Sequence, residues 1–407
     1  MRIYRIIASL ICALLILGLN AQTSLSLADV QQKVKDSNLD LKAQQVQEDI
    51  AESHIKQAKK FPNPELEVEL ENLGKNEIVV GISQPFELGG KRGIRVETAK
   101  LEAEISNLEL KQLKLELETE TNRKILPLLA VDREIELLDN FIAAARKTLA
   151  IMEERIEIGA AMILDKLRAE VELEELLLEH SASEAERFQL KKELAALWTG
   201  SPEDFNKIDV RVINDLQLPD LTEFYIALEN HTETKIQNLE RAIAKQELKD
   251  AKASAIPDLG IGAGIVRNNE EKENAFVLSA GLELPIFNRY KDEIKAVKLS
   301  RKVLDFEIDS AQLDRKAEIN TLYSEFTVLT NELYVLKTKI LPNLLTINQS
   351  INSYYEKGSV SFLEVLEAKS ELLETKSRLM ELYNTQAEIC NELYELSGYK
   401  IEFFQNL

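Results

Sequence analysis

The sequence predicts a mainly α-helical fold with β-hairpins, built from a long-helix and β-hairpin repeat that occurs twice. Three observations predict it. The 407 residues include only 14 Gly and 9 Pro, less than half the usual share of each, which favours long helices with few turns. The second half of the chain repeats the pattern of the first. Between two prolines of each half, apolar and polar residues alternate with the period of a strand.

The N-terminal residues 1–21 are typical of a signal peptide. Two arginines precede an apolar run over residues 6–19, which is followed by Ala21. We therefore expect cleavage before Gln22 and export of the mature chain. Cys390 is then its only cysteine, so an intramolecular disulfide is excluded.

The duplication is read from matched prolines and glycines. Pro64 matches Pro257 at an offset of 193, and Gly159 matches Gly358 at an offset of 199. The near-constant offset indicates two copies, with extra residues in a loop near 267–274 of the second. We expect the first repeat over 22–200 and the second over 201–407.

The segments between the prolines read as hairpins. In the first copy, Leu66 and Val68 alternate with glutamates, and Val80 and Ile82 follow a polar turn. The hairpins are expected at about 64–86 and 257–286. Strands of eight to ten residues come close to the length that crosses a bilayer with one face to lipid and one to a lumen. A small soluble β-domain packed on the helices is the alternative.

Long helices are expected after each hairpin, over about 90–158 and 288–357. Leu101, Leu108 and Leu115 are seven residues apart, and a second leucine series lies on nearly the opposite side. Two apolar seams indicate two helical neighbours, as in the wall of a helical cylinder or a multi-helix bundle. The tips follow at about 159–165 and 358–367, and Gly200 and Gly398 are expected to end the last helix of each copy.

These elements together predict an oligomer. Four strands cannot close a barrel, and a membrane-spanning sheet cannot leave its edges unpaired. Two copies would supply eight strands and three copies twelve. We infer that several chains close a barrel in the outer membrane, which the long helices extend into the periplasm.

At these residues the sequence resembles the TolC family of outer-membrane efflux ducts, over essentially the whole mature chain. Each copy runs from a helix through its proline-bounded hairpin into a long helix, and then to a glycine followed six residues later by an acid. These pairs are Gly159 with Asp165 and Gly358 with Glu364. Residues 63–72 with 83–92 look like the CzcC-like branch, whose members serve cobalt, zinc and cadmium efflux.

The resemblance implies a trimer with a twelve-stranded β-barrel and a periplasmic α-helical barrel. It also implies partners: a periplasmic adaptor (membrane fusion protein), an inner-membrane pump of the resistance-nodulation-division type and outer-membrane lipid.

By position in that family, Glu364 and Glu367 match two acids that form a ring at the periplasmic constriction. Tyr355 and Asp165 match a pair that ties the two helical hairpins together, beside the tip-turn glycines Gly159 and Gly358. Six carboxylates around a narrow axis would favour cations, and their repulsion would raise some pKa values. The alternative is that both glutamates only stabilise a helix N-terminus. Ile156 and Val360 depart from the family pattern.

Other classes of function have little support. A net charge of -20 argues against nucleic-acid binding, which needs a basic face. His54, His180 and His231 lack the spacing of metal ligands on a helix, and no phosphate loop or nucleophile motif is present. The glutamates of residues 65–71 are expected to line a water-filled lumen rather than to bind metal. We expect no enzyme activity, no cofactor and no metal site.

The sequence therefore predicts an outer-membrane exit duct of a tripartite efflux system that exports heavy-metal cations. Two alternatives remain open at this point. One is a duct of the same family for organic toxicants or secreted polypeptides. The other belongs to a different class, a periplasmic coiled-coil scaffold or adaptor with no barrel.

Overall fold

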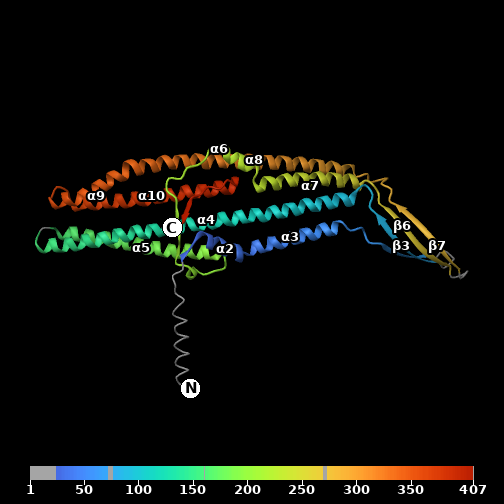
Figure 1. Cartoon of the computed structure of the whole chain (residues 1–407), viewed down its shortest axis with the longest axis horizontal. Helices are drawn as coiled ribbons and strands as arrows, with labels where there is room; N and C mark the ends of the chain where they lie inside the picture. Colours follow the sequence, from blue (N-terminus) through green and yellow to red (C-terminus); the bar gives the residue numbers. More distant parts are fainter. Residues whose placement is uncertain (1–23, 72–76, 160, 269–272, 407) are drawn as a thin grey trace, which may run out of the picture. The chain divides into compact units, whose positions relative to one another are not determined.

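The computed structural model describes residues 24–71, 77–159, 161–268 and 273–406 (Figure 1). The expected signal peptide and the middle of both hairpin loops lie outside the described residues. Across the described ranges, none of the helices combines the length and the apolar character needed to cross a bilayer.

The chain divides into two compact units, each containing parts of both expected repeats. Unit 1 is formed by Met1–Leu39, Lys114–Leu228 and Ala317–Leu407, and unit 2 by Asp40–Leu113 and Glu229–Lys316. The compact units are therefore not the two repeats. Corresponding segments of the two copies fold together instead.

Unit 2 contains two helix pairs, one from each copy. They are formed by α3 (Leu39–Ala58) with the first part of α4 (Lys91–Glu157), and by α7 (Thr232–Ser254) with the first part of α8 (Lys291–Val335). Asn107 Nδ2 on α4 donates to Glu48 Oε1 on α3 at 2.8 Å. Arg241 on α7 forms ion pairs with Asp305 at 3.1 Å and Asp309 at 2.5 Å on α8. Polar contacts thus fix the relative register of both pairs.

The same unit contains a four-stranded antiparallel sheet of order β2-β3-β6-β7. Its strands are β2 (Glu65–Glu71), β3 (Glu77–Phe86), β6 (Leu259–Asn268) and β7 (Glu273–Leu282), of which Figure 1 labels the last three. The pairing of β3 with β6 joins the hairpin of the first copy to that of the second. Pro85 lies within β3, whereas β7 ends before Pro285, so the two hairpins differ at their last strand.

Unit 1 contains two helical hairpins and several short elements. The remainder of α4 is followed by α5 (Ile163–Ala196), and the remainder of α8 leads to α9 (Leu341–Glu356) and α10 (Phe362–Ser397). The short elements are α2 (Leu27–Ser37), α6 (Leu221–Glu229), a 3-10 helix (Pro202–Asp204) and four strands: β1 (Ser24–Leu25) parallel to β4 (Lys207–Ile208), and β5 (Val210–Val212) antiparallel to β8 (Phe404–Asn406).

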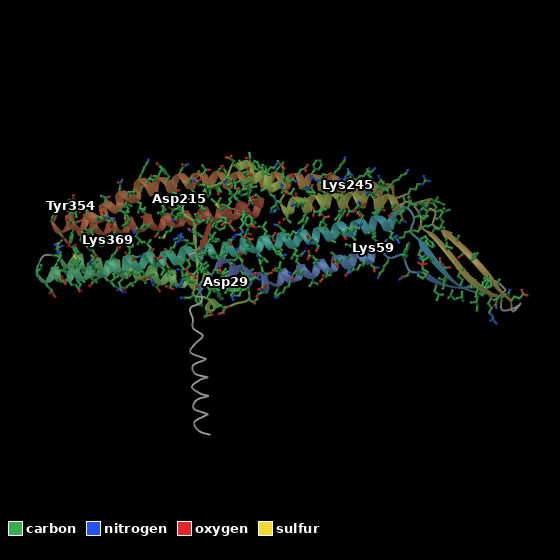
Figure 2. All side chains as sticks on the ribbon, in the orientation of Figure 1. Asp29, Lys59, Asp215, Lys245, Tyr354 and Lys369 are labelled. Atoms are coloured by element: carbon green, nitrogen blue, oxygen red, sulfur yellow. The ribbon has the colours of Figure 1, made fainter. Side chains whose placement is uncertain are left out.

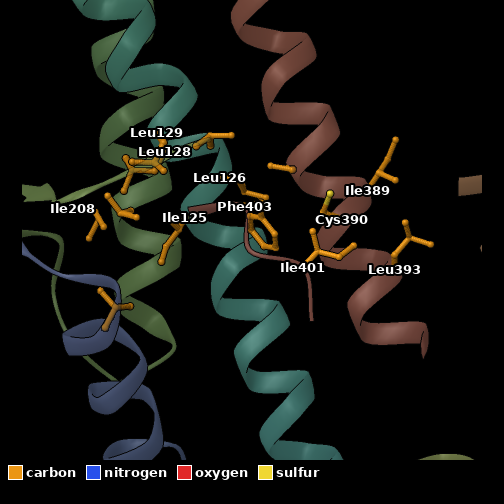
Figure 3. Close-up of a cluster of buried hydrophobic side chains, with 14 of the residues drawn as sticks. Ile125, Leu126, Leu128, Leu129, Ile208, Ile389, Cys390, Leu393, Ile401 and Phe403 are labelled. Atoms are coloured by element: carbon orange, nitrogen blue, oxygen red, sulfur yellow. The ribbon is translucent and has the colours of Figure 1, made fainter. Parts of the chain in front are cut away.

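The core of unit 1 forms where these elements meet (Figure 3). Ile125 and Leu126 of α4 and Leu393 of α10 are fully buried there. A buried amide pair lies nearby, because Asn122 Nδ2 donates to Asn391 Oδ1 at 2.9 Å. Buried amides need partners, so this bond favours one register of α4 against α10.

The second long helix is interrupted, whereas a continuous helix over 288–357 was expected. A π-helical turn at Leu336–Ile340 separates α8 from α9. Pro342 follows it and has no N–H to donate to the preceding turn, and the N–H of Leu341 bonds to Leu336 O. In the first copy, α4 continues through Pro127.

The ends of the two copies use different residues in the left-handed conformation. Gly398 caps α10 with φ 76°, as the sequence indicates. After α5 it is Thr199 that has positive φ, 57°, rather than Gly200. A Cβ on Gly200 would lie 2.1 Å from Trp198 Nε1, so this glycine permits close approach of the indole.

Candidate gate and sheet surfaces

The turn between α9 and α10 has the hydrogen bonds of a Schellman motif. Gly358 has φ +70°, its N–H bonds to Tyr355 O at 2.9 Å, and the N–H of Ser359 bonds to Tyr354 O at 2.9 Å. Gly159 has φ +72° in the turn between α4 and α5. Both tip glycines therefore occupy a backbone conformation that other residues adopt at a cost.

Glu364 caps its own helix. It is the third residue of α10, and its Oε2 accepts from Ser361 N at 2.6 Å while Ser361 Oγ accepts from Glu364 N at 3.3 Å. This capping box satisfies N–H groups at the helix end. The backbone and hydroxyl hydrogen bonds from Ser361 lower the pKa of Glu364. Repulsion between copies, which we expected to raise it, would act against this local effect.

Asp165 occupies the same third position in α5 but has another environment. The N-cap of α5 is Met162, which makes no side-chain capping bond. Asp165 is buried, with 6% of its surface exposed, and Arg168 Nη1 lies 3.8 Å from its Oδ1. Without a serine at the N-cap, the carboxylate cannot form a capping box and is available to another element.

That element is α9, through Tyr355. Burial raises the pKa of the Tyr355 hydroxyl, and the negative charge of Asp165 raises it further. The hydroxyl also lies 3.6 Å from Met152 Sδ of α4. The ring packs on Phe362 at 5.6 Å between centroids, and Arg155 Cζ lies 5.1 Å from its centre. Tyr355 and Asp165 thus connect the two helical hairpins of unit 1.

Glu364 and Glu367 share an exposed face of α10. They are one helical turn apart, while Phe362 and Val365 of the same helix are buried. Among the described side chains, no three His, Cys, Asp or Glu residues are grouped to hold a metal ion. The two acids are therefore placed to face solvent or another copy.

Lys369 is a residue near the tip that the sequence analysis did not single out (Figure 2). It lines a cavity of about 280 Å³ between the two helical hairpins, and its Nζ donates to Thr148 Oγ1 of α4 at 2.9 Å. Burial lowers its pKa, which the charge of Glu172 on α5 opposes. The sequence feature that could have identified Lys369 is its position seven residues after Phe362, which places it on the same buried side of α10.

The sheet of unit 2 has two unlike faces. Its register places most of the large apolar side chains on one face, where Phe276 is 91% and Leu278 86% exposed, while Val79, Val266 and Val277 lie on the other. The opposite face carries Glu67 on β2 and glycines on β3 and β6. A Cβ on Gly264 would lie 2.8 Å from Val80 O, so close strand packing requires glycine there. Lipid suits the first face and water the second.

Two helical hairpins and a four-stranded sheet, formed by matched halves of one chain, are the architecture of an outer-membrane channel subunit of the TolC type. A sequence model of the family described as "Outer membrane efflux protein" matches residues 30–200 and 224–399. The chain belongs to this family.

The comparisons identify relatives at low identity. The cobalt-zinc-cadmium resistance protein CzcC of Cupriavidus metallidurans is 23% identical over 338 residues, covering 82% of this chain and 80% of the relative. The nickel-cobalt-cadmium resistance protein NccC of Alcaligenes xylosoxydans xylosoxydans is 22% identical, covering 66% of this chain and 63% of that one. The solved structure of CusC, described in terms of transmembrane channel formation, has a TM-score of 0.77 at 16% identity and covers 92% of each chain. This last likeness shows the fold.

Proposed function

We propose that the protein is the outer-membrane exit duct of a tripartite efflux system, which exports heavy-metal cations such as cobalt, zinc or cadmium from the periplasm. The similarity to CzcC and NccC supports this substrate class. A periplasmic adaptor and an inner-membrane pump of the resistance-nodulation-division type would be its partners. The duct itself is passive, so the pump supplies the energy.

The observation that carries the proposal is the sheet of unit 2. It exposes a continuous apolar face, and it has outer edges on β2 and β7 that no described strand covers. An edge of this kind pairs with another chain or aggregates. Three copies joined edge to edge would give a twelve-stranded barrel with lipid outside and the glutamate and glycine face inside.

Exposed stripes on the helices of unit 2 support a homotrimer. On α8, Leu299, Val303, Phe306 and Leu313 are between 52% and 73% exposed, although they follow the spacing of a coiled-coil seam. On α3, Val46 is 57% exposed. The expectation of two neighbours for each long helix is met only if another copy covers these stripes.

At the tip we propose two roles. Glu364 and Glu367 form the constriction that selects cations, and Tyr355 with Asp165 forms a latch that holds the helical hairpins together. Their placement supports this, because the acids are exposed and the charge of Asp165 acts on the Tyr355 hydroxyl. The turns at Gly159 and Gly358 set the ends of the hairpins. We also retain the division into repeats 22–200 and 201–407, which the two matched segments of the family model support.

The first experiment is growth of a strain that lacks the gene in zinc, cobalt, cadmium, copper, a detergent and a dye. Metal hypersensitivity with accumulation of cell-associated metal, both reversed by the gene, is expected. Sensitivity restricted to organic compounds would retain the duct and refute the metal assignment.

A second experiment tests the sheet. Leu278→Glu places a charge on the apolar face, whereas Ala275→Glu on the same strand places one on the opposite face. We expect only Leu278→Glu to reduce the detergent-extracted, heat-modifiable oligomer in the outer membrane. Equal oligomer from both variants, or release of the wild type into buffer, would favour the scaffold.

A further inference from the structure

A cavity of about 1080 Å³ lies within unit 1, beside the short β5 and β8 strands. Side chains of α4, α5 and α10 complete its walls. It is distinct from the tip, because its lining includes none of the gate or latch residues. Its volume is in the range of pockets that hold small molecules.

The lining is basic in a chain of net charge -20. Three of its ionisable residues are acidic, and two of these are matched: Asp132 Oδ1 lies 2.7 Å from Arg187 Nε, and Asp139 Oδ1 lies 3.3 Å from His180 Nε2. Glu136 is the third. Its cationic residues are five: Arg133, Arg187, Lys207, Arg211 and Lys376.

Four of the five cations of the lining, namely Arg133, Arg211, Lys207 and Lys376, form no ion pair among the described residues. Arg133 and Arg211 are the two guanidinium groups among these four. Arg133 is partly buried on α4, and its Nη2 donates to Val212 O at 3.3 Å. Burial lowers the pKa of Arg133, and the positive charge of Arg211 lowers it further, while the charge of Glu136 opposes both effects. Two guanidinium groups therefore repel one another at the cavity wall.

An oxyanion would remove this repulsion. A guanidinium presents a planar set of donors that matches a carboxylate or a phosphate, and most of the donors of Arg133 remain available. Gln405 lies opposite Arg211 in the β5–β8 register and lines the same cavity, so it adds an amide donor.

We propose that this cavity binds an oxyanion, a carboxylate or a phosphate group, between Arg133 and Arg211. The site contains none of the proposed gate and latch residues, and it goes beyond the duct function.

The test uses the full-length oligomer in lipid nanodiscs, titrated with inorganic phosphate and, in a second arm, with sodium acetate. Ionic strength is held constant with chloride. Saturable stabilisation against thermal unfolding is expected in at least one arm, and the arm that responds identifies the group. Arg211→Gln, at an exposed position, should weaken binding tenfold or more.

The matched control is Arg146→Gln, an exposed arginine of α4 outside the cavity lining. It should bind as the wild type does. No saturable binding in either arm, or equal weakening by Arg146→Gln and Arg211→Gln, would overturn the proposal. The Arg133→Gln variant, provided that it folds, should also bind more weakly, but the conclusion does not depend on this variant.

Discussion

The contact between Tyr355 and Asp165 gives a quantitative prediction for channel opening. Tyr355→Phe removes the hydroxyl group of the proposed latch, Asp165→Ala removes its carboxylate, and the double variant removes both. In the proposed latch, a hydrogen bond from the Tyr355 hydroxyl to the Asp165 carboxylate, which is only 6% exposed, would contribute about 1.5–3 kcal/mol to the closed state. Since about 1.4 kcal/mol is a tenfold change in an equilibrium constant, opening should increase about 10- to 150-fold per protomer.

The assay is the open probability of single channels in planar lipid bilayers. Because the two residues share one interaction, the double variant should resemble either single variant rather than the sum of both. Tyr354→Phe is the matched control. Its ring is half exposed and lies 5.9 Å from Lys357 Nζ. Records indistinguishable from wild type, or full additivity of the two changes, would refute the latch.

Three further predictions concern the gate, the cap of α10 and the core. Glu364→Ala combined with Glu367→Ala should lower cation selectivity and block by divalent ions in bilayers, and unchanged block would exclude a gate. The pKa of Glu364 is lowered, so its cap should stabilise α10 above the ordinary glutamate pKa of about 4.3 and be lost as pH falls through the lowered value. Hydrogen exchange over 358–370 should therefore differ between wild type and Glu364→Gln at neutral pH and converge in acid; a constant difference would contradict the cap. Burial raises the pKa of Cys390 from 9.0 to about 12, so its thiolate fraction at neutral pH falls about 1,000-fold and maleimide should label it only after unfolding. Rapid labelling of the folded protein would contradict its burial.

The elements with a regular period were predictable from the sequence. Alternation at Leu66 and Val68 predicts the strand that the structure contains, and leucines seven residues apart predict the long α4 helix. These signals are local, because the period of apolar residues follows from the geometry of one element.

The short strands of unit 1 were not predictable in this way. Ser24 pairs beside Lys207, and Val212 pairs with Phe404. Such pairs of two or three residues have too few positions to show alternation, and their partners are distant in the sequence. They form because the core around Ile125 brings these segments together.

At the tip, the sequence located the acids but not their different environments. Asp165 and Glu364 hold the same position in their helices, yet one is buried and the other caps its own helix. The difference follows from the N-cap residue, which is Met162 in α5 and Ser361 in α10. This residue is visible in the sequence. The interaction of Asp165 with Tyr355 depends on packing between the two hairpins, so it is not visible in the sequence.

The even number of strands in the unit 2 sheet has a consequence for assembly. Adjacent strands alternate in direction, so β2 and β7 at the two edges run in opposite directions. A ring of identical copies joined from β7 to β2 is then antiparallel at every junction, whatever the number of copies. Strand polarity permits any stoichiometry, so in the proposed trimer the number of subunits would be set by the apolar stripes of α3 and α8. Substitutions that change the number of subunits should therefore be sought on the helices.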